Sequence, residues 1–165
     1  MVGDELPAGY LKAGAEYVAA VEKLGLRPHL AGWGWDEAQH GWLLVIVTSI
    51  YDAGGPLELN KLLFKAYNAG ATPQQISPFT VKVFSPEVVP KHYLEMQPGE
   101  HDMQSADPIT NEVKAHFKGY LTIDLYGTKI SGIHLIKTRF EKPRSYHANQ
   151  REWWQFRRNV ERLAA

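Results

Sequence analysis

The sequence predicts a single α+β domain over residues 1–165, in which helices pack on a mainly antiparallel sheet. Amphipathic segments with helical spacing alternate along the chain with short apolar segments of strand length. Two of the strand-length regions contain internal turn residues, as β-hairpins do. With 165 residues and 44% hydrophobic side chains, the chain is long enough to bury one core. The expected order is helix, β-hairpin, helix, strand, β-hairpin, helix.

The first helix is expected over residues 7–24. Pro7 suits the first turn of a helix, and Gly25 suits the position after its last turn. Apolar side chains recur at helical spacing and should form one buried stripe, made of Tyr10, Leu11, Tyr17, Val18, Val21 and Leu24.

Residues 29–51 read as the first hairpin, with a turn at "DEAQHG". Trp33 and Trp35 are two residues apart and therefore share one face of a strand, while glycines occupy the opposite face. The segment 42–51 is apolar on both faces, which predicts a central strand covered on each side. Something bulky must cross the face of Gly32 and Gly34, either a neighbouring helix or a ligand.

A second helix is expected between Pro56 and Gly70, and a short strand over residues 78–85. The segment "TPQQIS" between them is interpreted as one further helical turn, and Phe79, Val81 and Val83 should share one strand face. The unit 42–85 is typical of a right-handed strand–helix–strand crossover. Four prolines break the following segment, so residues 86–111 are predicted to form an irregular loop.

A two-residue turn at Tyr126–Gly127 would set the register of the second hairpin, with paired residue numbers summing to 253. One face is then almost wholly apolar, as a correct register requires, and it includes His134. The other face carries Ile133 and Leu135 in its middle. Its basic end holds Lys114, Lys118, Lys137 and Arg139, with Tyr120 among them.

The last helix is expected over residues 149–163. Trp153, Phe156, Val160 and Leu163 lie within a narrow arc that should face the core. If this helix covers the second hairpin, Trp153 and Phe156 should lie over Ile133 and Leu135. Trp154 points elsewhere, beside Arg151, Arg157 and Arg158.

Several classes of chemistry find no motif in the sequence. The chain has no cysteine, which excludes disulfides, thiolate nucleophiles and cysteine-ligated metals. HExxH, GxSxG and P-loop patterns are absent, and His92, His101 and Asp102 match no familiar metal-site spacing. We therefore expect neither a cofactor nor a metal.

No signal peptide and no apolar run of about 20 residues is present, so a cytoplasmic location without membrane contact is expected.

The net charge of zero hides an asymmetry. Residues 1–110 carry a net charge of −6, and residues 111–165 carry +6. Such a division suits an anionic partner for the basic part, or mutual neutralisation within one fold.

Three functional hypotheses follow. The leading one is a non-catalytic interaction module that binds a protein partner, or its own copy, through a basic C-terminal surface. The second is nucleic-acid binding through the basic face of the second hairpin. The third is a small-ligand binder or enzyme with an aromatic pocket. The residues of the first two are Lys114, Lys118, Tyr120, Lys137, Arg139, Arg151, Trp154, Arg157 and Arg158, and the pocket would comprise Trp33, Trp35, Tyr51 and His134.

Overall fold

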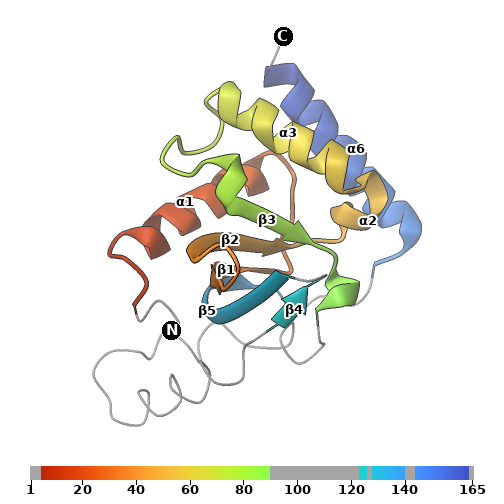
Figure 1. The fold of residues 1–165 in the computed structure, drawn as a ribbon. Helices are drawn as coiled ribbons and strands as arrows, with labels where there is room; N and C mark the ends of the chain where they lie inside the picture. The colour runs from red at the N-terminus through yellow and green to blue at the C-terminus, as the bar shows by residue number, and fades with distance from the viewer. Residues whose placement is uncertain (1–4, 90–122, 126–127, 140–143, 164–165) are drawn as a thin grey trace.

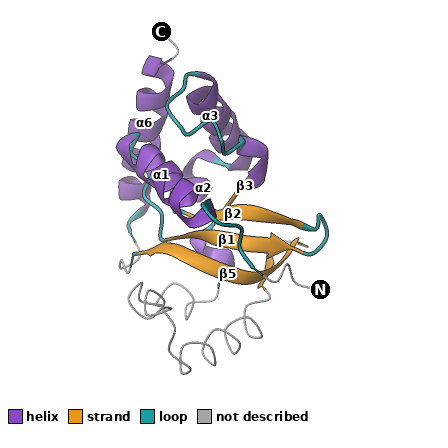
Figure 2. Ribbon diagram, turned by 90° about the vertical axis from the view of Figure 1, so that its left-hand side faces the viewer, coloured by secondary structure: helices purple, strands orange, loops and turns teal. Residues whose placement is uncertain are grey.

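The computed structural model describes residues 5–89, 123–125, 128–139 and 144–163. These residues form an α+β fold whose elements follow the predicted order of helix, hairpin, helix, strand, hairpin and helix (Figure 1). The sheet has the strand order β3-β2-β1-β5-β4, and three of its four pairings are antiparallel. The described α-helices lie on one side of this sheet (Figure 2).

Helix α1 spans Tyr10–Lys23 and buries Tyr17, Val18 and Val21 against the sheet. Its end is the predicted one: Gly25 has φ +102°, and the N–H of Leu26 donates to the carbonyl of Val21 at 3.1 Å. The predicted stripe is wrong at its first turn, because Tyr10 and Leu11 are 37% and 50% exposed. The helix begins three residues later than predicted, and its first turn extends beyond the core.

The first hairpin consists of β1 (Leu30–Asp36) and β2 (Gly41–Val47), paired from Leu30↔Val47 to Asp36↔Gly41. The predicted central strand is confirmed as far as Val47, and its residues from Leu43 onward are buried. Its predicted extension to Tyr51 is wrong. The chain turns at Thr48 and Ser49 into the short helix α2 (Ile50–Gly54), so Tyr51 lies on a helix.

Helix α3 spans Pro56–Asn68, as predicted, and buries Leu59, Leu62, Leu63 and Ala66. The segment "TPQQIS" forms a non-helical turn, so the predicted extra turn of helix is wrong. Strand β3 (Val81–Phe84) pairs in parallel with β2, so α2 and α3 form the connection of a strand–helix–strand unit.

Phe79 was predicted to share a strand face with Val81 and Val83, but it is not on strand β3. It lies in the 3-10 helix η1 (Pro78–Thr80), is 78% exposed and packs edge-on against Phe64. A second 3-10 helix, η2 (Pro86–Val88), opens the segment predicted as irregular, and that segment otherwise lies outside the described residues.

The second hairpin consists of β4 (Ile123–Leu125) and β5 (Thr128–Thr138). Its described pairs, from Ile123↔Ile130 to Leu125↔Thr128, have the predicted register. The predicted face alternation is wrong further along β5, because its register against β1 shifts twice. One shift coincides with Gly132, whose φ of +59° suits glycine. Ile130 therefore joins Ile133 in one apolar cluster, while His134 faces Trp42 on the opposite side.

Helix α6 spans Tyr146–Leu163 and buries Trp153, Phe156 and Val160. Leu163 was predicted to face the core but is 42% exposed. The helix packs on α2 and α3, not on the second hairpin (Figure 1). Trp153 packs closely on Gly54 of α2, because a Cβ atom added to Gly54 would lie 2.4 Å from the indole ring of Trp153.

The sheet separates two apolar clusters. The cluster on the helix side contains Trp33, Trp153 and Phe156, with residues from each of the described α-helices. The opposite cluster is made of Leu30, Leu43, Val45, Val47, Phe84, Val89, Ile130 and Ile133. The alternative in which the last helix covers the second hairpin does not hold for Ile133 and Leu135, because they lie on the opposite side of the sheet from Trp153 and Phe156.

Candidate functional site

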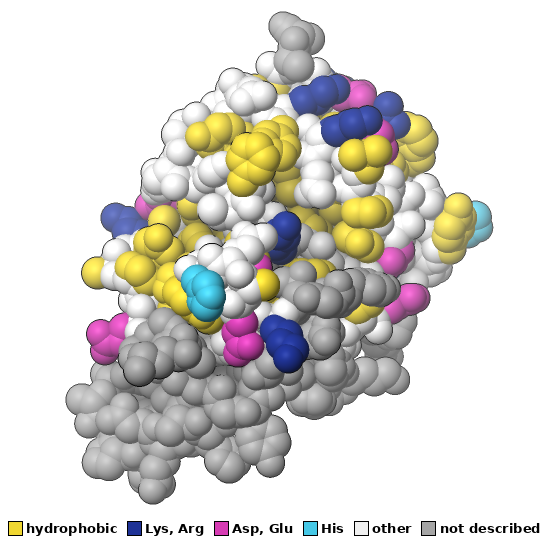
Figure 3. Space-filling view, viewed as in Figure 1, with side chains coloured by type: hydrophobic (Ala, Val, Ile, Leu, Met, Phe, Trp, Pro, Cys, Tyr) yellow, Lys and Arg dark blue, Asp and Glu magenta, His cyan; other side chains and the backbone are white. Residues whose placement is uncertain are grey.

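One face of α6 carries an exposed tryptophan among arginines. We call Arg151, Trp154, Arg157 and Arg158 the α6 surface. Their spacing places Arg151, Trp154 and Arg158 on the side of the helix away from Phe156, whereas Arg157 is half-buried at the edge of that side. Trp154 is 54% exposed, and the guanidinium carbon of Arg157 lies 5.3 Å from the centre of its ring. A space-filling view shows cationic, acidic and apolar side chains close together over α3 and α6 (Figure 3).

The arginines of the α6 surface differ in their partners. Arg157 donates to Glu161 Oε1 at 2.9 Å, one helical turn away, and this hydrogen bond raises the pKa of the guanidinium above its already high value. Among the described residues, Arg151 and Arg158 form no ion pair, and both side chains are exposed. The surface therefore presents, on either side of Trp154, two positive charges that no described carboxylate pairs with.

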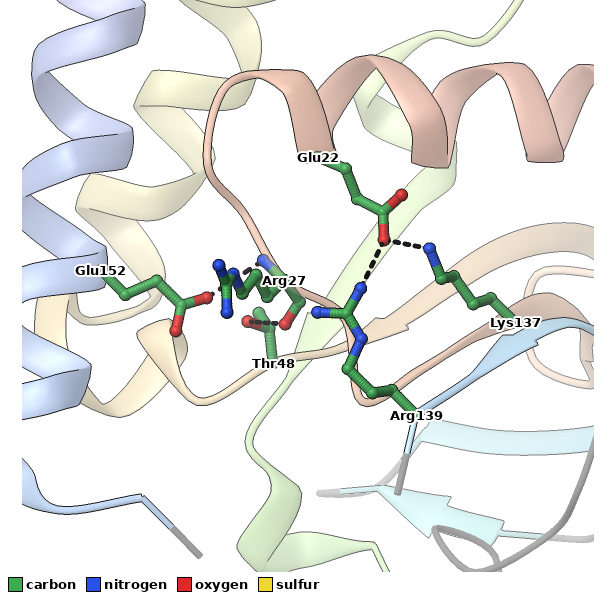
Figure 4. A network of polar contacts seen from close by, with 6 residues as sticks. All are labelled: Glu22, Arg27, Thr48, Lys137, Arg139 and Glu152. Atoms are coloured by element: carbon green, nitrogen blue, oxygen red, sulfur yellow. Dashed lines mark hydrogen bonds and ion pairs between the residues drawn. The ribbon is translucent and has the colours of Figure 1, made fainter. Parts of the chain in front are cut away.

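The predicted basic face of the second hairpin differs from the α6 surface, because its described cations have an acidic partner. Glu22 of α1 accepts hydrogen bonds from Lys137 and from Arg139 Nη2, the latter at 3.3 Å (Figure 4). One carboxylate thus compensates part of this positive charge, and α1 covers this end of β5. Lys114, Lys118 and Tyr120 lie outside the described residues.

The structure brings some of the predicted pocket residues together. The rings of Trp35 and Trp42 lie 5.4 Å apart edge to face, and Trp42 and His134 repeat this arrangement at 5.4 Å. Trp33 is a core residue, only 4% exposed, and its indole N–H donates to the carbonyl of Tyr10 at 2.7 Å. Tyr51 is not part of this group, because it follows the opposite end of β2.

Sequence reasoning missed a cluster of polar side chains at that opposite end of the sheet. His29 Nε2 and Ser49 Oγ lie 2.6 Å apart, and Ser85 donates to Asp52 Oδ2 at 2.7 Å. Thr48 donates to the carbonyl of Arg27 at 3.1 Å, and the Arg27 N–H donates to Glu152 of α6 (Figure 4). The available signal was the change from apolar to hydroxyl side chains at Thr48 and Ser49, where β2 ends.

No protein-family model, no curated protein and no solved structure matches the chain. Its own residues must therefore carry the functional interpretation. None of the helices among the described residues is long and apolar enough to cross a membrane. Within the described part of the chain, His, Asp and Glu side chains form no group of three that could hold a metal ion.

Proposed function

We propose that this protein is an interaction module that binds an acidic protein surface through the α6 surface. The observation that carries the proposal is Trp154, a large aromatic side chain that is 54% exposed and flanked by arginines. Tryptophan and arginine are enriched among the residues that dominate binding energy at protein interfaces.

The geometry of α6 favours such a role. Trp154 lies on a helix anchored by Trp153 and Phe156, and the guanidinium of Arg157 packs against its ring. An anchor held in this way loses little conformational freedom on binding, and this lowers the cost of association. The uncompensated charges of Arg151 and Arg158 favour a partner that carries carboxylates.

The hairpin is a weaker candidate for binding nucleic acid. Phosphate binding needs cationic side chains that exchange counterions freely. Lys137 and Arg139 both hydrogen-bond to Glu22, so a phosphate would have to compete with a carboxylate already in place. The described residues of this face therefore do not favour the nucleic-acid hypothesis.

The test is a titration of the protein with a fluorescent acidic peptide containing one central leucine. A basic peptide of the same length and a single-stranded oligonucleotide serve as comparison ligands. We expect the acidic peptide to bind preferentially. Trp154→Ala should raise its Kd about 30-fold, because loss of an interface anchor costs about 2 kcal/mol. Phe79→Ala is the matched control, since Phe79 is also an exposed aromatic residue but lies outside α6.

Three results would contradict the proposal. The first is equal affinity for the acidic and basic peptides. The second is tighter binding of the oligonucleotide with a steep salt dependence, which would favour nucleic-acid binding. The third is a Kd for the acidic peptide that Trp154→Ala and Phe79→Ala change equally.

A further inference from the structure

The polar cluster at one end of the sheet contains a serine hydroxyl and an imidazole in direct contact. His29 directly precedes β1, and Ser49 follows β2 by two residues. The hairpin register pairs Leu30 with Val47, so both side chains are brought to the same end of the sheet. His29 Nε2 and Ser49 Oγ lie 2.6 Å apart, within the distance that a nucleophile and its general base require.

The position of Ser49 distinguishes it from the other serines in equivalent positions. Ser49, Ser77 and Ser85 each immediately precede a helical segment. The hydroxyls of Ser77 and Ser85 accept a backbone N–H of the helix that follows, as capping serines do. Ser49 makes no such capping bond, although it stands at the start of α2. Its hydroxyl is directed to His29 instead.

The location within the sheet is also suited to a reaction site. Strands β2 and β3 are parallel, and Ser49 and Ser85 follow their carboxyl ends. In open α/β sheets, ligands bind outside the carboxyl ends of parallel strands, and β2 and β3 form the parallel pair of this mainly antiparallel sheet. Ser49 retains 8% exposure and His29 is partly exposed, so the pair is sheltered without being sealed.

We propose that Ser49 and His29 form a nucleophile–base pair that hydrolyses small carboxylic esters. The hydroxyl of Ser49 attacks the ester carbonyl carbon while His29 Nε2 accepts its proton. The carbon–oxygen bond to the alcohol then breaks, and the alcohol leaves with the proton returned from His29. Water, deprotonated by His29, cleaves the acyl-serine ester, releases the carboxylic acid and restores Ser49.

The test combines labelling and turnover. The purified chain is treated with a fluorophosphonate, which traps activated serines, and the modified peptide is identified by mass spectrometry. Hydrolysis of p-nitrophenyl acetate is measured in parallel for wild type, Ser49→Ala and His29→Gln. We expect wild type to carry the adduct on Ser49. Both variants should lose labelling and hydrolysis about 100-fold or more, the usual contribution of a positioned general base.

Ser85→Ala is the matched control, since Ser85 is also buried, at the end of the neighbouring strand, but hydrogen-bonds to Asp52. It should keep wild-type labelling and hydrolysis. The proposal is overturned if wild type carries no adduct on Ser49, or if Ser49→Ala hydrolyses the ester at the wild-type rate. Mapping the adduct on wild type decides the question even if Ser49→Ala fails to fold.

Discussion

Gly32 and Gly34 show how single residues set the packing of this sheet. Among the described residues, Ile130 and Ile133 of the neighbouring strand β5 cover the glycine face of β1. A Cβ at Gly34 would lie 2.3 Å from a methyl group of Ile130. A Cβ at Gly32 would lie 2.6 Å from the carbonyl oxygen of His134, which belongs to the backbone. Side chains can shift to relieve a contact, whereas a paired strand cannot.

We therefore expect Gly32→Ala to lower the free energy of unfolding by about 1–3 kcal/mol, the usual cost of overpacking. Gly41→Ala is the control on the same hairpin, because a Cβ there would meet only one atom, at 3.9 Å. Urea unfolding followed by tryptophan fluorescence measures both. Equal stability of the two variants would show that β5 can move away from β1.

The phenol of Tyr17 is buried in the core between α1 and the sheet. It is completely buried, and its hydroxyl has no hydrogen-bond partner among the described residues. Burial raises the pKa of this phenol above its ordinary value, because the phenolate would lose its hydration. Below pH 10 the phenol is protonated in both the folded and the unfolded chain, so the raised pKa costs no stability there. Above about pH 10 the unfolded chain ionises first, and stability falls by up to 1.36 kcal/mol per pH unit.

Tyr17→Phe should accordingly unfold with a shallower loss of stability above pH 10 than wild type. At pH 7 it should be as stable as wild type or more stable, because it removes a buried hydroxyl that has no hydrogen-bond partner among the described residues. Urea unfolding at a series of pH values from 7 to about 11 measures both effects. An identical alkaline slope in the two proteins would place the loss of stability at other groups.

Helix α6 packs on α2 and α3, and its buried side chains belong to the same core cluster as theirs. Its buried residues recur every three or four positions and end with Val160. Leu163 continues the same spacing but is exposed, because α6 extends past the core at this point. Hydrophobic periodicity predicts which side of a helix is buried, but it does not predict where the neighbouring elements end.

Phe156→Ala and Leu163→Ala test this difference on one helix. Phe156 is completely buried, so its truncation should lower the free energy of unfolding by about 3–5 kcal/mol. Leu163→Ala should change it by less than about 0.5 kcal/mol, as most surface substitutions do. Thermal unfolding followed by circular dichroism compares the two. A large effect of Leu163→Ala would mean that this residue packs against something in solution.

The predicted elements agree with the structure where local rules determine them. Pro56, Gly25 and the alternation of Trp33 with glycine act through neighbouring residues, and these features were predicted. The face of β5 depends on bulges against a distant strand, so strict alternation misplaced Ile133 and His134. The contact of His29 with Ser49 depends on the end of β2 at Val47, and the prediction of one strand through Tyr51 concealed that end.

At the scale of the whole molecule, the charge is divided along the chain. Residues 1–110 carry −6 and residues 111–165 carry +6. Part of this division is neutralised within the fold, because Glu22 of α1 binds Lys137 and Arg139. Arg151 and Arg158 form no ion pair among the described residues. They remain available to the acidic part of a second copy.

This arrangement predicts weak, salt-sensitive self-association. Sedimentation velocity at about 0.01 M salt should show the apparent mass rising with concentration, and about 1 M salt should abolish the rise by shortening the Debye length. The double variant Arg151→Glu/Arg158→Glu should remain monomeric at both salt concentrations. A monomer at low salt contradicts self-association. A dimer that persists at high salt would indicate an apolar interface in place of the α6 surface.

The central position of β1 has a consequence for how the chain folds. One of its neighbours, β2, follows immediately in the sequence, whereas the other, β5, lies roughly a hundred residues further on. The first hairpin can therefore form early from local contacts, but β5 must find β1 after a large loop has closed. We expect this long-range pairing to limit the folding rate. Until it forms, one edge of β1 is open to pairing with strands of other chains.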